Sequence, residues 1–474
     1  MIHSERIQNL NGKSETQGEY VLYWMQQSAR AHYNHALELA LQQATALKMP
    51  LLVVFVLTDS FPEANLRHYR FLLEGLEETR SRLTSRGIQF ALFRGEPVPA
   101  VTAVADRAAM LVCDRGYLRI QRQWRNEIAA SIECRCVQVE SDVVVPVEIA
   151  YPKEAYTAGI LRPKLHSVLE QFLVELPEAA VQKPSVQIDF GLEELSAALP
   201  HCSLVPSDRV LSGPGGLEAE LQVDRDVAPV DWIHGGTSAA LQRLEEFLAR
   251  KIDHFHELRN DPSVDYLSHL SPYLHFGHIS VLYIVLQVLA MRRNGKPSTG
   301  AGPDGEGSAA FIEELVVRRE LAMNFAYYNP DYDSYNCLPE WAHKTLAAHE
   351  VDRRDYLYSL EQLESAKTHD PYWNAAQQEM TRRGKMHGYM RMYWGKKILE
   401  WSAHPQEAFE RALYLNNKYS LDGRDPNGFA GVAWCFGKHD RAWPERPVFG
   451  KTRYMNSNGL KRKFDIETYT RKYS

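Results

Sequence analysis

The chain has 474 residues, of which 45% are hydrophobic and 24% charged, a composition typical of a globular protein long enough for two domains rather than of a disordered chain. No apolar run is long enough to span a bilayer, and the polar residues 1–20 lack the apolar core of a signal peptide. We therefore expect a cytoplasmic protein, or a nuclear one in a eukaryote. The six cysteines contain no CxxC pair, so neither a disulfide framework nor a metal site has support.

The net charge of −6 is unevenly distributed along the chain. From residue 381 to the end, 19 Lys and Arg stand against 9 Asp and Glu, so this quarter carries +10 and the remainder −16. A basic quarter on an acidic body indicates a local surface for a polyanion. The alternative is a solvated basic face without a partner.

The first 150 residues predict alternating strands and helices. Strands are expected at 20–25, 51–59, 88–95, 111–114 and 134–146, and helices at 29–47, 69–87, 100–110 and 118–131. This pattern predicts an α/β domain with a doubly wound parallel sheet. Ligands bind at the carboxyl ends of the strands in such sheets, so we expect a small-molecule site there, although the absence of GxGxxG argues against an ordinary dinucleotide site.

The rest of the chain predicts a linker and an all-helical domain. Residues 177–236 are rich in Pro, Gly and Ser, which gives domain boundaries of 1–176, 177–236 and 237–474. Helices are expected at 237–259, 277–292, 309–326, 356–366, 371–383, 388–402 and 405–415. We expect the glycine-rich loop at 292–308 to be mobile.

Two stretches of the helical half carry polar residues that suit a ligand. In SHLSPYLHFGHIS (268–280), Ser268 and Ser271 adjoin a helix start marked by Pro272, which suits a phosphate; N-capping by Ser271 is the alternative. In FIEELVVRRELAMNF (311–325), Glu314 lies near an apolar face and is placed to hydrogen-bond or protonate a heterocycle. An ion pair between Glu314 and Arg318 is the alternative there.

Two further features are a loop and a set of tryptophans. Residues 415–443 are rich in Asp, Asn and Gly and show little hydrophobic periodicity. This predicts a structured loop that contributes to a functional site. Trp394 and Trp401 are seven residues apart and share one face of a predicted helix, and Trp373 lies upstream. Packing in the core is the alternative explanation for these rings.

Motifs in these stretches resemble a known family. YWMQQSAR, CDRGYLRIQRQWR, RNDP, LSPYLHFG, EELVVRREL, MRMYW, NNKYSLDGRDPNGFAGVAW and FGKHDRAW occur in the order found in the photolyase/cryptochrome superfamily. Nearly the whole chain resembles the class II cyclobutane pyrimidine dimer (CPD) photolyases. The resemblance implies a monomeric enzyme with a U-shaped FAD in its helical domain. In that family the light-excited, fully reduced flavin passes an electron to a flipped-out dimer in DNA, the cyclobutane ring opens, and the electron returns.

The resemblance also implies roles for individual residues. The FAD contacts would be Phe255, Arg259, Ser268, Leu270, Ser271, Arg391, Asn416, Asp422 and Gly423, with Asn416 facing flavin N5. The contacts to DNA and dimer would be Arg259, Asn260, Glu314, Met392, Trp434, Lys438 and Arg441. Glu314 would contact the thymine pair and Trp434 would stack on the flipped dimer. Electrons would reach the flavin from Trp401 at the surface through Trp373 to Trp394.

Two positions depart from the family pattern. Phe255 stands where the family often has a tyrosine near the FAD, so we expect one hydroxyl contact to be missing. Gln27 and Ser28 stand where an Arg-Asp-like pair is common, beside the pocket for a light-harvesting antenna chromophore. A deazaflavin (8-hydroxydeazaflavin), a folate (methenyltetrahydrofolate) and an empty pocket all stay open. A cryptochrome-like signalling flavoprotein is the alternative function, although the short basic C-terminus favours repair.

Overall fold

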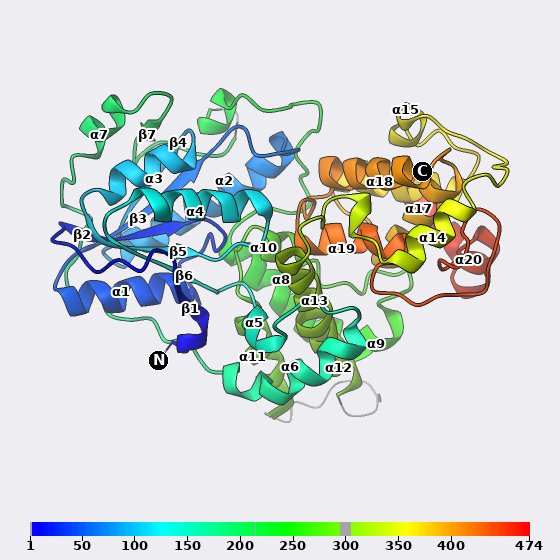
Figure 1. Ribbon diagram of the computed structural model, residues 1–474, viewed down its shortest axis with the longest axis horizontal. Coiled ribbons are helices and arrows are strands. Elements are labelled where there is room, and N and C mark those ends of the chain that lie inside the picture. Colours follow the sequence, from blue (N-terminus) through cyan, green and yellow to red (C-terminus); the bar gives the residue numbers. More distant parts are fainter. Residues whose placement is uncertain (1, 214, 294–304) are drawn as a thin grey trace.

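The computed structural model describes residues 2–213, 215–293 and 305–474. Most of the loop that we expected to be mobile, at 292–308, lies outside these residues. The described chain forms an α/β part from its first half and a helical part from its second half (Figure 1). This confirms the predicted fold class.

A seven-stranded sheet is the centre of the α/β part. Its strands are β1 (Ile7–Asn9), β2 (Tyr20–Met25), β3 (Leu51–Leu57), β4 (Gln89–Arg94), β5 (Ala108–Asp114), β6 (Arg135–Val139) and β7 (Ser203–Val205). The order is β1-β6-β5-β2-β3-β4-β7, with the five central strands parallel and both edge strands antiparallel. The edge strands were not predicted, because three residues are too few for a recognisable alternation. Strand β7 lies within the predicted linker at 177–236 and extends the sheet.

Helices cover both faces of the sheet. They are α1 (His35–Leu47), α2 (Leu66–Ser85), α3 (Pro97–Ala105) and α4 (Arg119–Ser131), with α7 (Leu192–Ala198) beside β7 at the edge. Helices α5 (Val147–Ala150) and α6 (Ala158–Phe172) lie instead beside the helical part, where α6 packs on residues 313–318 (Figure 1). Side chains alternate along β2, so that Val21 and Tyr23 pack with α1 and α2 whereas Leu22 and Trp24 pack with α3 and α4. The predicted helix at 100–110 is wrong beyond Ala105, because the apolar residues that follow enter strand β5.

The second half is helical. It contains α8 (Thr237–Arg250), α9 (Phe255–Leu258), α10 (Ser271–His275), α11 (Val281–Arg293), α12 (Glu306–Ile312), α13 (Arg319–Tyr328), α14 (Glu340–Ala348), α15 (Leu360–Glu364), α16 (Pro371–Arg383), α17 (Gly388–Glu400), α18 (Pro405–Tyr419), α19 (Pro426–Cys435), α20 (Ser457–Lys463) and α21 (Ile466–Tyr473). The expected helix at 237–259 is divided by a 3₁₀ turn, Ile252–His254. The one expected at 309–326 is divided by a π-helical segment, Glu313–Arg318.

The loop predicted at 415–443 is largely helical. Helix α18 extends to Tyr419 and α19 begins at Pro426, which leaves only residues 420–425 as a turn between them. Helix α19 was missed because it is buried on several sides and built from small residues, so it lacks the amphipathic pattern of a surface helix.

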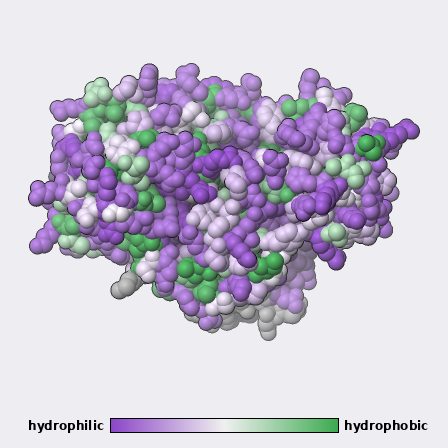
Figure 2. Space-filling model, in the orientation of Figure 1, coloured by the Kyte–Doolittle hydropathy of each residue, from purple (hydrophilic) through white to green (hydrophobic). Residues whose placement is uncertain are grey.

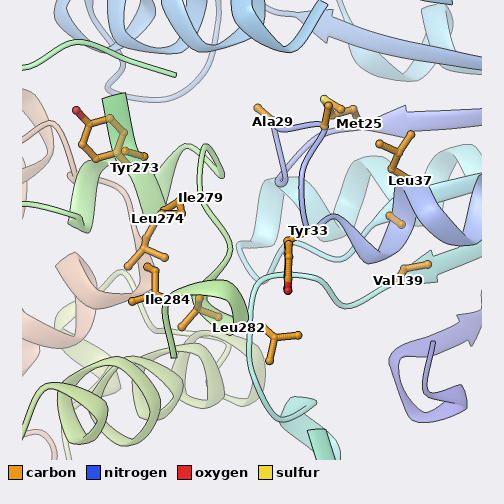
Figure 3. Packing of buried hydrophobic residues seen from close by; sticks show 14 of the residues in the cluster. Met25, Ala29, Tyr33, Leu37, Val139, Tyr273, Leu274, Ile279, Leu282 and Ile284 are labelled. Carbon is orange, nitrogen blue, oxygen red and sulfur yellow. The ribbon is translucent and has the colours of Figure 1, made fainter. Parts of the chain in front are cut away.

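The two parts share one hydrophobic core. Figure 3 shows Met25 and Leu37 of the α/β part in the same packed region as Tyr273, Leu282 and Ile284 of the helical part. The visible surface in Figure 2 is mainly hydrophilic, with hydrophobic residues in small scattered groups. Of the helices in the described residues, none has both the length and the apolar character required to cross a bilayer.

Candidate functional site

A cavity of about 320 Å³, here called the helical-domain cavity, brings distant segments together. Its wall comes from α9, from the loop before α10, from α12 with the π segment, from the start of α17, and from the turn before α19. The lining includes seven of the residues expected at a site: Phe255, Ser268, Leu270, Ser271, Glu314, Arg391 and Asp422. Motifs that were separate in the sequence therefore meet around one space.

Both serines of the 268–280 stretch line this cavity. The side chain of Ser271 does not cap α10, so the capping alternative is wrong. Ser268 Oγ accepts a hydrogen bond from the Leu270 N–H at 3.4 Å, and Pro272 occupies the first turn as expected. The serine hydroxyls and the free N–H groups of the helix start are thus available to a ligand.

Glu314 lies on the π segment and reaches the cavity wall. Its carboxylate pairs with Arg259, while Arg318 pairs with Glu313 at 3.2 Å. The ion pair between Glu314 and Arg318, which was the alternative interpretation of this segment, therefore does not form, because the wider π turn changes which side chains are neighbours. Glu313 is also held by Arg162 of α6 at 2.7 Å, and of the two neighbouring glutamates only Glu314 lines the cavity.

Several cationic groups in the wall have unused hydrogen-bonding capacity. Arg391 Nη2 lies 3.5 Å from Asp422 Oδ1, a long contact, and the buried Nε of Arg391 has no partner in the described residues. Arg259, which pairs with Glu314 at the cavity wall, likewise has an Nε without a partner within the described residues. Lys385 also lines the cavity, and burial lowers the pKa of its ammonium to about 8. This donor set fits a ligand that has anionic phosphates and a heterocycle with acceptor atoms, as FAD has.

Asn416 and Gly423 do not line the cavity but lie behind its wall. Asn416 is buried on α18, and its Nδ2 lies 3.2 Å from Asn417 Oδ1. A Cβ at Gly428 of α19 would come within 3.0 Å of that same nitrogen, and one at Gly423 within 2.9 Å of the Asn416 carbonyl. The two glycines therefore let α19 and the 420–425 turn approach Asn416 closely.

A second cavity of about 130 Å³, the sheet-end cavity, lies at the carboxyl ends of β2 and β3, where the fold predicted a small-molecule site. Phe55, Tyr69 and Trp124 contribute to its wall. Gln27, one of the two departures from the family pattern, lines it, and its Oε1 accepts a hydrogen bond from Gln121 at 2.7 Å.

The two cavities share a wall. Asp425 lines both and its Oδ2 lies 3.1 Å from Nδ1 of His275, which lines the sheet-end cavity. Burial is the largest single influence on the pKa of Asp425 and raises it, but the hydrogen bonds from His275 and Asn427 and the charges of His275 and Arg319 together outweigh burial, so the net pKa is lowered. Arg319 of the helical-domain cavity pairs with Asp142 of the sheet-end cavity at 2.8 Å. Burial raises the pKa of Asp142 to about 6.

The three tryptophans form a continuous stack. The rings of Trp394 and Trp373 are parallel within 7° at a centroid distance of 6.4 Å, and Trp373 lies 5.7 Å from Trp401 at 66°. Trp373 is therefore in the middle, in agreement with the expected order. Trp401 is only 2% exposed, so its expected position at the surface is wrong: the rings of Tyr358 and His369 cover it.

Comparisons with known proteins identify the family. A sequence profile described as DNA photolyase matches residues 21–184. A deoxyribodipyrimidine photo-lyase of Methanothermobacter thermautotrophicus is 53% identical over 470 residues, which cover 99% of this chain and 98% of that protein. Another, of Potorous tridactylus, is 41% identical over 97% of this chain and 82% of that protein. The chain belongs to the DNA photolyase family.

A solved photolyase has the same fold. The archaeal photolyase of Sulfolobus tokodaii, solved with two FAD molecules, superimposes with a TM-score of 0.68 at 16% identity over 96% of this chain and 89% of that one. At this identity the likeness concerns the fold alone. As a member of its family, the present photolyase is a lyase of DNA repair.

The residues expected on the DNA side of this photolyase fall into two groups. Asn260 and Arg441 are exposed, and the Arg441 guanidinium lies 4.9 Å from the Trp443 ring centre. Lys438 does not belong there, because it is buried, pairs with Glu154 and donates to the Cys337 carbonyl at 2.8 Å. A phosphate contact would require breaking these bonds.

Trp434 and Met392 are half-buried on neighbouring helices and lie outside the lining of the helical-domain cavity. The Arg453 guanidinium lies over the Trp434 ring, 5.1 Å from the ring centre. The sulfur of Cys435, next to Trp434, contacts the Met392 carbonyl at 3.9 Å, which keeps α19 against α17.

Sequence reasoning missed Arg319, Lys385 and Asp425. Arg319 reads as a surface residue beside Arg318, yet it is buried and points to Asp142. Asp425 had a detectable signal: Asp-Pro at a helix start, where its Oδ1 accepts from the Asn427 N–H at 2.8 Å. Nothing in the local sequence marks Lys385, whose burial depends on the packing of α16 and α17.

Proposed function

We propose that this photolyase repairs cyclobutane pyrimidine dimers in DNA, with FAD in the helical-domain cavity and blue light as the energy source. The observation that supports this most strongly is that seven residues of the family's expected site line one cavity. When bound and reduced, FAD supplies the electron that opens the ring of the dimer. The start of α10, with Ser268 and Ser271, would hold its phosphates.

Four side chains would position the reacting groups. Arg391 and Asp422 form an opposite-charge pair on the cavity wall and would orient the polar edge of the flavin. Glu314 would accept a hydrogen bond from the thymine pair, and Arg259 holds its carboxylate in place. Asn416 would face flavin N5 after a small displacement of the 420–425 turn.

The substrate would enter as a flipped-out dimer. A dimer stacks and pairs poorly, which lowers the cost of extruding it from the duplex. Trp434 would receive it, and Arg441 and Asn260 would contact the backbone without reading its sequence. The tryptophan stack would bring the electrons that convert the flavin to its active reduced state.

The sheet-end cavity would hold the antenna chromophore. The aromatic rings of Phe55, Tyr69 and Trp124 in its wall suit a flat ring system, and 8-hydroxydeazaflavin and a folate both meet this requirement. We further propose that the photolyase acts as a monomer on damaged DNA.

A repair assay tests the proposal. Photolyase reduced under a thiol is mixed with UV-damaged oligothymidylate, and the return of thymine absorbance is followed in blue light and in the dark. Repair is expected in blue light and not in the dark. Bound FAD together with intact dimers after irradiation would contradict the proposal and favour the signalling alternative.

A further inference from the structure

A third cavity, of about 290 Å³, adjoins Trp401 at the end of the tryptophan stack farthest from Trp394. We call it the Trp401 cavity. Trp401 is nearly inaccessible from open solvent, yet its ring forms part of this wall. Tyr356 stacks on His369 at 3.7 Å, and His369 lies 5.3 Å from the Trp401 ring. A molecule in the cavity would therefore contact the aromatic groups that end the stack.

The charges around this cavity favour an anion. Arg353 and Arg446 are exposed, and neither has a carboxylate within 4 Å in the part of the chain that the structure describes. Lys397 is already paired with Glu400, so Asp355 is the remaining acidic group of the wall. Two guanidinium groups without a carboxylate partner outnumber the one unpaired carboxylate of the wall, so the entrance of the cavity carries a net positive charge.

Arg354 adds a positive charge that is held in place. Its side chain donates to the backbone carbonyls of Asp352 at 2.6 Å and Ser402 at 3.2 Å, and the residue lines the cavity. A fixed guanidinium at the edge of the cavity raises the local positive potential, which favours a carboxylate or another small anion.

We propose that the Trp401 cavity binds a small anionic reductant that returns an electron to Trp401. This rests on the proposed role of the tryptophan stack. After Trp401 has given an electron to Trp373, its ring lacks one electron. A thiolate in the cavity supplies that electron, Trp401 becomes neutral and closed-shell again, and the thiolate becomes a thiyl radical. Two thiyl radicals then combine to a disulfide, and the proton of each thiol goes to water.

The test uses two thiols that differ in charge. The rate of flavin photoreduction under constant blue light is measured against the concentration of 3-mercaptopropionate, a carboxylate, and of neutral 2-mercaptoethanol. We expect the rate to saturate with the first and to rise linearly with the second. Arg353→Gln or Arg446→Gln should raise the half-saturating concentration of 3-mercaptopropionate about fivefold at low salt, since a unit charge at 4 Å in water contributes about 1 kcal/mol. Added salt should reduce the difference.

Arg250→Gln serves as the matched control, because Arg250 is exposed on α8 and does not line the cavity. Identical concentration curves for the two thiols, in the parent and in both arginine variants, would overturn the proposal. The variant Trp401→Phe shows whether it is the binding of the anion that is wrong or the proposed electron transfer through the tryptophans. If that variant photoreduces as fast as the parent, the stack does not carry electrons; if it is slow while the arginine variants match the parent, only the binding of the anion is wrong.

Discussion

Replacement of Trp373 by Phe tests whether the stack carries electrons or merely fills the core. Trp373 is fully buried, stacks on Trp394, contacts Trp401, and donates from Nε1 to the Trp394 carbonyl at 3.0 Å. Phe keeps an aromatic ring at the position but loses the N–H and part of the ring, and it is much harder to oxidise.

The structural cost of this change is moderate. The lost hydrogen bond contributes about 1 kcal/mol, and the carbonyl that it leaves can keep its bond within α17. The smaller ring buries about 40 Å² less apolar surface, worth about 1 kcal/mol, and leaves a small void. We expect Trp373→Phe to lower the free energy of unfolding by about 2–3 kcal/mol, which a domain of this size tolerates with bound FAD intact.

The electronic cost is larger. Without Trp373, the rings of Trp394 and Trp401 are separated by about 10 Å along the helix, two turns of α17. We expect photoreduction to slow by at least about tenfold, which corresponds to only about 1.4 kcal/mol of added barrier. The assay is the rate of flavin bleaching in blue light with excess thiol, alongside thermal unfolding and flavin absorbance.

Trp341→Phe is the control for this experiment. Trp341 also donates from its indole, to the Tyr156 hydroxyl at 2.7 Å, but lies outside the stack. Dithionite-reduced Trp373→Phe should repair dimers at the parental rate, since the stack serves reduction and not ring opening. Parental photoreduction by Trp373→Phe would refute the electron-transfer reasoning and return the three rings to a packing role.

Three other predictions follow from individual contacts. Glu314→Gln should lower the repair yield several-fold with unchanged flavin content, whereas Glu313→Gln, which breaks the pair with Arg162, should affect thermal stability instead; equal loss of repair and flavin in Glu314→Gln would reassign Glu314 to structure. Arg441→Ala should weaken DNA binding and reduce the slope of log affinity against log salt by about 1, whereas Lys438→Ala should lower stability with little change in that slope. Burial raises the pKa of Glu320 from 4.5 to about 8, so the folded protein keeps a proton that the unfolded chain releases. Stability should therefore fall as pH rises from about 4.5 to 8, by up to about 1.4 kcal/mol per pH unit, and thermal unfolding of Glu320→Gln should show a flatter dependence.

Local sequence was sufficient for the longer strands and the amphipathic helices of the α/β part and for the family. The largely apolar runs of β2, β3 and β4 and the amphipathic helices α1 and α2 are visible because the hydrophobic residues of each follow a single pattern along the whole element. The motifs around Ser268, Glu314, Arg391 and Asp422 were recognisable because their residue types and order are themselves unusual.

The tertiary structure decided which partners and surroundings those residues have. The π segment that turns Glu314 from Arg318 to Arg259, the burial of Lys438 and Trp401, and the wall shared by the two cavities depend on contacts between segments that are distant in the sequence. A one-dimensional pattern records which side of a helix is apolar, but it does not record which other segment covers that side. Burial and charge pairing at a position are set by that partner, and so only the packed chain determines them.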